Sequence, residues 1–228
     1  MMKRLATFAA VLFLSACIGG QSPGDPAKIL RDSASAMASI KSATATLKVT
    51  KGTLSIQGFA LVSAKTAVRM PSDSDTVYTV KQQDISFALE VVIVPGHVYL
   101  HIPFSPFREV TGPEAAAFPN MAKLFDPATG LPAIIPQGTN KKYVASEQLD
   151  GRTVDHVTAI YSPEQVHALL AELNSSGPVT ANLWISSSDH LVRKAVLDGN
   201  FGDEGKDAAV EVDISNFNGT VSITSPTP

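Results

Sequence analysis

The side chains that could do chemistry in this chain are few and far apart. The sequence holds five histidines and one cysteine. His97 and His101 share one face of an expected strand, but at strand rise they lie roughly 13 Å apart, too far to bind one metal ion. His156 and His190 each follow an aspartate, and adjacent residues of a strand point to opposite faces. We therefore expect these histidines, like His167, to be solvated or hydrogen-bonded side chains.

The motifs of common enzyme classes are also missing from the sequence. It has no Gly-x-Ser-x-Gly nucleophile motif, no glycine-rich phosphate loop and no paired histidine–carboxylate metal motif. We therefore expect no catalytic residue, no metal site and no cofactor, and an enzyme is the least favoured class.

The chemistry that the sequence does indicate is lipid attachment at Cys17. Lys3 and Arg4 precede an apolar run over residues 5–14. That run is too short to span a bilayer, which takes roughly 20 residues, but it has the length of a signal-peptide core. The sequence Leu14-Ser15-Ala16-Cys17 that follows fits a lipobox, in which a diacylglyceryl group joins the thiol and the signal is cut just before it. The alternative is an ordinary secretory signal with a chance cysteine.

The lipobox divides the chain into three parts. Residues 1–16 are expected to be a cleaved signal peptide, residues 17–25 a lipidated flexible tether rich in Gly, Ser and Pro, and residues 26–228 one domain. Acyl chains on Cys17 would hold that domain at the extracytoplasmic face of the cell membrane. Because this cysteine is the only one, the domain has no disulfide and depends on its core for stability.

The composition of the chain disfavours two classes of binding partner. Removal of Lys3 and Arg4 with the signal leaves 16 of the 18 basic residues against 21 acidic ones. An acidic chain without a basic patch is a poor match for nucleic acid or for electrostatic attachment to anionic lipid. Apolar residues make up 44% of the chain and charged residues 17%, which is ample material for one large domain.

The elements that must position any site begin with a helix. Asp25 can cap a helix that has Pro26 at its first position. Apolar residues then recur at helical spacing, which predicts an amphipathic helix over residues 26–40. A second helix is expected to open at Ser162-Pro163, with an apolar stripe formed by Val166, Leu169, Leu170 and Leu173.

Most of the remaining chain follows a period of two, which is typical of strands. The Pro95-Gly96 and Asp150-Gly151 pairs mark hairpin turns. The pattern predicts about ten strands in one antiparallel sheet, and a sheet of that size curls or closes. The expected strands cover residues 44–49, 54–59, 86–93, 98–102, 141–149, 153–161, 179–186, 191–199, 208–217 and 219–224.

The long connection over residues 103–140 is unusual for its apolar content. It carries seven prolines and eight Phe, Leu or Ile residues, and short helical pieces are expected around 113–118 and 128–135. Long connections are normally polar and lie on the surface. The apolar residues must therefore pack against the sheet or line a hollow.

The sequence resembles the LppX/LprA/LprF/LprG family of mycobacterial-type lipid-binding lipoproteins over nearly the whole mature chain. Five stretches carry the resemblance: residues 30–43 (LRDSASAMASIKSA), 125–131 (FDPATGL), 149–157 (LDGRTVDHV), 181–185 (ANLWI) leading to 191–195 (LVRKA), and 214–221 (ISNFNGTV). Residues 64–85 and 103–120 depart from the family pattern, so the identity of a ligand cannot be carried over.

The resemblance implies an α+β fold with a single large curved antiparallel sheet, a half-barrel, whose concave face is covered by helices. It also implies that acyl chains of a lipid or glycolipid bind in the apolar hollow and are carried or delivered in the cell envelope. Some members act with a major-facilitator exporter, which makes such an exporter an implied partner.

Candidate ligand-binding residues combine this fold with the apolar pattern. For each one, a place in an ordinary packed core is an equally good reading. Phe104 and Phe107, between prolines, are the candidates for a flexible mouth. The full set is Phe59, Leu61, Phe87, Leu89, Val91, Ile93, Phe104, Phe107, Leu124, Leu131, Ile134, Ile135, Val166, Leu169 and Leu170.

Three functions remain open at this point. The first is a lipid carrier at the outer face of the membrane, and the second is a non-transporting module that tethers a partner to the envelope. The third, an envelope hydrolase, is ranked last because no catalytic motif is present.

Overall fold

The computed structural model describes residues 24–169 and 175–227. The expected signal peptide, Cys17 and most of the tether lie outside the described residues, and so does Leu170. Among the described residues, no helix combines the length and the apolar character needed to cross a membrane.

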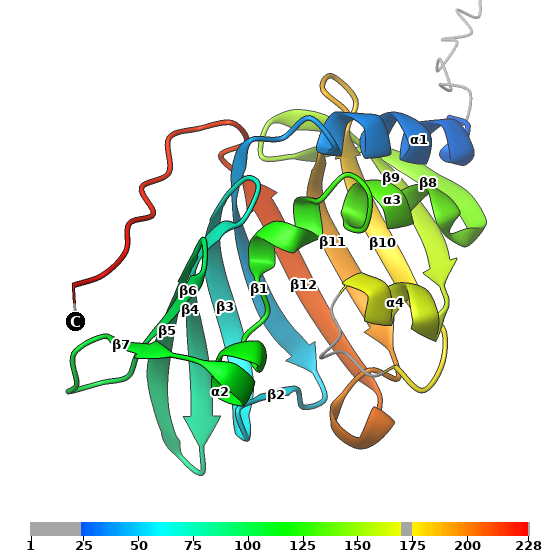
Figure 1. Cartoon of the computed structure of the whole chain (residues 1–228). Helices are drawn as coiled ribbons and strands as arrows, with labels where there is room; N and C mark the ends of the chain where they lie inside the picture. The colour runs from blue at the N-terminus through cyan, green and yellow to red at the C-terminus, as the bar shows by residue number, and fades with distance from the viewer. Residues whose placement is uncertain (1–23, 170–174, 228) are drawn as a thin grey trace, which may run out of the picture.

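The core of the fold is one 12-stranded antiparallel sheet, seen in Figure 1. Its spatial order is β7-β6-β5-β4-β3-β1-β12-β11-β10-β9-β8, with β2 paired to β3 outside this path. The strands are β1 (Ser42–Lys51), β2 (Ser55–Ile56), β3 (Phe59–Arg69), β4 (Asp73–Gln82), β5 (Ile85–Val94), β6 (His97–His101), β7 (Arg108–Val110), β8 (Thr139–Leu149), β9 (Arg152–Tyr161), β10 (Val179–Ser186), β11 (Val192–Gly199) and β12 (Ala208–Ser215).

The sheet is open and curved rather than closed. Strands β3 to β7 form an N-terminal wing, strands β8 to β12 form a C-terminal wing, and β1 joins them by pairing with both β3 and β12. The edge strands β7 and β8 stand at opposite ends of this path. The predicted large curved antiparallel sheet is therefore confirmed, with more strands than the sequence pattern indicated.

Short helices lie across one side of the sheet, which we call the concave face (Figure 1). They are α1 (Pro26–Met37), α2 (Gly112–Ala116), η1 (Met121–Phe125), α3 (Leu131–Ile134), η2 (Ile135–Gln137) and α4 (Pro163–Leu169), while η3 (Asp203–Gly205) lies in the connection between β11 and β12. The expected cap of α1 is present, since the Asp25 carboxylate accepts a hydrogen bond of 2.9 Å from the Ala27 N–H. Helix α1 ends at Met37 rather than at residue 40.

Two parts of the strand prediction were wrong. The expected strand over residues 54–59 is only the two-residue β2 and a turn into β3. The expected strand over residues 219–224 is not a strand, because this segment belongs to an irregular C-terminal tail, residues 216–227. Conversely, the segment 64–85, to which no element was assigned, contains most of β3 and all of β4.

The C-terminal tail packs on the face of the N-terminal wing opposite to the helices, which we call the outer face. Ile223 is only 3% exposed and contacts a small cluster that includes Val92 and Tyr99. Isolated hydrogen bonds rather than a strand ladder hold the tail backbone: Arg69 donates to the Ile223 carbonyl at 3.1 Å, the Ser42 hydroxyl donates to the Gly219 carbonyl at 2.7 Å, and the Asn218 N–H donates to the Ser42 carbonyl at 2.8 Å.

Candidate functional site

The alternation of β1 sets the character of the concave face. Ala43, Ala45, Leu47 and Val49 point to one side of this strand, where they join the hydrophobic core. Leu47 lies directly opposite Val212 on β12 and opposite Ala64 on β3. Directly opposed residues of an antiparallel pair share a face, so the apolar surface runs from one wing to the other without interruption.

The N-terminal wing carries one apolar cluster on this face. Val80 and Val91 are 0% and 1% exposed, and Phe118, from the connection after α2, belongs to the same cluster. Phe59 and Phe87 meet edge to face, with ring centroids 5.1 Å apart and an interplanar angle of 82°. The six predicted strand residues all belong to or pack against this cluster: Phe59, Leu61, Phe87, Leu89, Val91 and Ile93.

The C-terminal wing carries a larger cluster that the helices cover. Leu30 and Met37 of α1 are both 0% exposed within it. The Tyr161 hydroxyl donates to the Ile135 carbonyl at 2.9 Å, which ties η2 to β9. Burial raises the pKa of Tyr161, so this hydroxyl keeps its proton and its role as a donor. The predicted residues brought together here are Leu124, Leu131, Ile134, Ile135, Val166 and Leu169.

Between the two clusters lies an apolar surface that stays partly open to solvent. We call it the central strip and define it as Leu47 and Val49 of β1, Leu61 of β3, Ala195 and Leu197 of β11, and Val212 of β12. All six side chains are partly exposed. Leu47 and Leu61 pack against both clusters, so the strip is the floor that joins the two wings.

Two predicted residues lie away from this face. Phe104 is fully exposed in the loop between β6 and β7. Phe107, at the end of the same loop, packs with Val92 in the cluster on the outer face. The structure therefore brings neither phenylalanine to the central strip.

Several residues of the concave face were missed by the sequence reasoning. Leu47 and Val212 belong to strands with a visible period of two, but 165 positions separate them and no local pattern shows that they are paired. Tyr78 lies near Phe118, with ring centroids 6.5 Å apart and an interplanar angle of 35°, on a strand that the sequence left unassigned. The alternation of apolar residues along each strand is the signal that could have identified these residues. To combine the strands into one face, however, requires the strand order, which only the structure gives.

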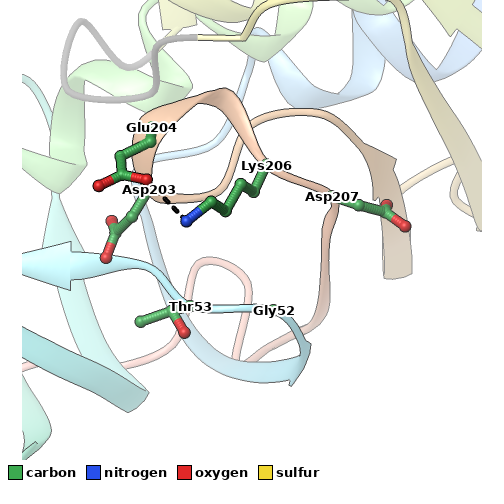
Figure 2. Close-up of a pocket in the computed structure, with 6 residues that line it drawn as sticks. All are labelled: Gly52, Thr53, Asp203, Glu204, Lys206 and Asp207. Carbon is green, nitrogen blue, oxygen red and sulfur yellow. Dashed lines mark ion pairs between the residues drawn. The ribbon is translucent and has the colours of Figure 1, made fainter.

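A polar depression at the end of the sheet is a different kind of site, drawn in Figure 2. It has a volume of about 330 Å³ and is lined by Gly52, Thr53, Asp203, Glu204, Lys206 and Asp207. Its carboxylates already have partners: Asp203 accepts from the Ser55 N–H at 2.9 Å, and Glu204 pairs with Lys206 at 2.6 Å. Within the described ranges, no group of three His, Cys, Asp or Glu side chains could hold a metal ion.

His156 and His97 contact side chains of neighbouring strands. His156 stacks on Trp184 with centroids 4.2 Å apart and lies within hydrogen-bond distance of Glu147 and Asn182, at 3.0 and 3.1 Å. Hydrogen bonds from Trp184 and His156 lower the pKa of Glu147. His97 lies 2.7 Å from Glu109 on the neighbouring strand. These contacts join side chains of adjacent strands.

Comparisons with known proteins agree with this architecture. A family model described as LppX_LprAFG lipoprotein matches residues 25–223. The crystal structure of LprF from Mycobacterium bovis superposes with a TM-score of 0.72 at 19% identity, over 91% of this chain and 100% of that chain. That of the Mycobacterium tuberculosis lipoprotein LppX gives 0.63 at 17% identity, over 87% and 98%. A search of curated proteins found no match.

Proposed function

The chain belongs to the LppX_LprAFG lipoprotein family, and from that premise we propose that it is a membrane-anchored lipoprotein which binds acyl chains on its concave face. Its cargo would be an acylated lipid or glycolipid that it carries or delivers in the cell envelope. The observation that supports this most directly is the central strip, an apolar floor left partly exposed between two buried clusters.

The energetics of such a site need no polar group. Burying one methylene is worth about 0.8 kcal/mol, so ten methylenes on the strip would gain roughly 8 kcal/mol before the costs of ordering and association. The side chains that the site would offer are aliphatic and aromatic. This accounts for a binding protein whose sequence shows no catalytic motif.

The anchor completes the proposal. Residues 1–16 would be removed, Cys17 would carry the lipid, and residues 17–25 would link it to α1, whose first residue is Pro26. Membrane attachment would then come from the acyl chains at the extracytoplasmic face. A major-facilitator exporter as a partner is proposed on the resemblance alone.

Native mass spectrometry of the protein released from its anchor tests the proposal. The wild type should retain an acylated lipid, and Leu47→Asp should lose it because a carboxylate on the strip is incompatible with an alkyl chain. Thr46→Asp is the matched control, since Thr46 neighbours Leu47 on β1 and points to the opposite face.

Two results would contradict the carrier. If the wild type held no lipid and took up none from vesicles, a non-transporting tethering module would be the better reading. If Thr46→Asp lost lipid as completely as Leu47→Asp, the ligand would not lie on the concave face.

A further inference from the structure

The loop that joins β6 to β7 presents an exposed apolar tip. Phe104 is 108% exposed and Ile102 is 40% exposed, and Pro103 stands between them. We call these three residues the apolar tip. Residues 102–107 read Ile-Pro-Phe-Ser-Pro-Phe and contain no charge. An isolated exposed apolar side chain is ordinary, but a fully exposed phenylalanine beside an exposed isoleucine in an uncharged loop calls for a reason.

The backbone conformation of the tip makes phenylalanine energetically unfavourable at position 104. The Ser105 N–H donates to the Ile102 carbonyl at 3.2 Å, which closes a turn with Pro103 and Phe104 at its centre. Phe104 has a φ of +66°. A proline followed by a positive φ is the pattern of a type II turn, where glycine or asparagine is favoured at the second central position. The chain therefore holds a bulky aromatic residue in a strained conformation that also exposes it.

The base of the loop is fixed, so the tip projects from a firm support. Phe107 stacks on His101 with ring centroids 4.9 Å apart and an interplanar angle of 28°. It also packs with Val92 on the outer face. Arg108, which begins β7, pairs with Glu114, so its charge is matched within the protein.

We propose that the apolar tip inserts into the interfacial region of a lipid bilayer. Aromatic and aliphatic side chains on a projecting, uncharged segment are suited to the boundary between headgroups and acyl chains. A stable protein interface buries about 800 Å² on each partner, which is far more surface than three residues present. Because no free cation stands within residues 102–107, the contact depends on apolar insertion and not on anionic lipid.

Depth-dependent quenching tests this contact on the intact, processed protein. The variants Phe104→Trp and Val144→Trp are placed on phosphatidylcholine vesicles with bromine atoms on the acyl chains. The fluorescence of the wild-type protein, whose one tryptophan is Trp184, is subtracted from that of each variant. Val144 is a matched control because it is 50% exposed but lies on β8, at the far edge of the sheet. Tryptophan at position 104 should lose most of its emission, and tryptophan at position 144 should lose almost none.

A second variant separates insertion from folding. Phe104→Gly suits the positive φ, so its melting temperature should equal or exceed that of the wild type. For this comparison both proteins also carry Ser105→Cys, which is labelled with a polarity-sensitive dye, and both are placed on the same vesicles. The dye should report a solvent-exposed environment in the Phe104→Gly variant and a buried environment in the protein that keeps Phe104.

An unquenched tryptophan at position 104 would overturn the proposal, and so would equal quenching at positions 104 and 144. Flotation of the protein with vesicles reports separately whether the lipid anchor holds the chain. The quenching result has the same meaning with anchored protein and with protein added freely to excess vesicles. A tip that is quenched only when a second protein is added would point to a protein partner and would also refute direct insertion.

Discussion

The central strip makes a prediction that distinguishes a binding surface from a packed core. Val212 and Val91 are both valines on the concave face, but Val212 is partly exposed on the strip while Val91 is 1% exposed within the cluster of the N-terminal wing. Replacing each with tryptophan adds the same volume to two different environments. If the strip is a binding surface, only the substitution at Val91 should strain the fold.

The magnitudes follow from the two environments. Overpacking a filled core costs typically about 1–3 kcal/mol, and Val91→Trp should lie at the upper end because the site has no exposed side. For a domain of this size each kcal/mol lowers the melting temperature by roughly 2–4 °C, so Val91→Trp should melt roughly 6–12 °C below the wild type. The indole of Val212→Trp can extend along the strip, which should limit its cost to less than about 1 kcal/mol.

The assay combines thermal unfolding by circular dichroism with native mass spectrometry of bound lipid. Val212→Trp should keep its melting temperature within about 4 °C and lose the co-purified lipid, because the indole occupies the place of the acyl chain. A melting temperature for Val212→Trp as low as that of Val91→Trp would mean that the strip is core. Full retention of lipid by a stable Val212→Trp would place the ligand elsewhere.

Three further predictions concern other parts of the molecule. Burial and the nearby charge of Glu90 raise the pKa of Asp75, whose Oδ1 atom is buried without a hydrogen-bond partner. Folding therefore favours the protonated form of Asp75. The contribution of this group to the free energy of unfolding is present at low pH and is lost as the pH rises through the raised pKa. Asp75→Asn should accordingly raise the melting temperature at neutral pH and leave it unchanged below about pH 3.8, the ordinary pKa of the group; a lower melting temperature at pH 7 would show that the carboxylate is needed. Tyr161→Phe removes the 2.9 Å hydrogen bond to the Ile135 carbonyl and should cost about 1–3 kcal/mol in a denaturant titration, because the buried carbonyl is left unpaired; no change would mean that η2 finds another donor. Cys17→Ala should give a protein that is uncleaved or released, and membrane retention equal to the wild type after a high-salt wash would exclude the anchor.

The sequence was most informative where one face of a strand is buried and the other is wet. Strand β1 alternates between Leu47 or Val49 inside and Lys48 outside, so both its existence and its inner face could be predicted. Strand β4 begins Asp73, Ser74 and Asp75, polar on both faces, and its period of two is invisible in hydrophobicity. Polar residues are tolerated there because the C-terminal tail covers one face and neighbouring hydroxyls pair on the other, as in the 2.8 Å contact of Thr66 with Thr76.

The strand wrongly predicted over residues 219–224 and the central strip that was not predicted both depend on contacts between residues far apart in the sequence. Val221 and Ile223 alternate as in a strand, but both pack sideways onto the outer face and Arg69 takes up the Ile223 carbonyl. The central strip could not be predicted because it depends on which strands are neighbours. Long-range register is fixed by the summed burial of whole faces, and no short stretch of sequence contains that sum.

The open path of the sheet also has a consequence for how the protein avoids associating with itself. A sheet that does not close leaves unpaired backbone donors and acceptors along β7 and β8, and such rows are templates for pairing with other chains. Strand β7 offers only three residues. Strand β8 breaks its register twice, after Thr139 and after Tyr143, and carries Lys141 and Lys142 in between. Short length, bulges and lysines are established ways of blunting an exposed edge, so both open edges of this sheet are protected against pairing with a strand of another chain.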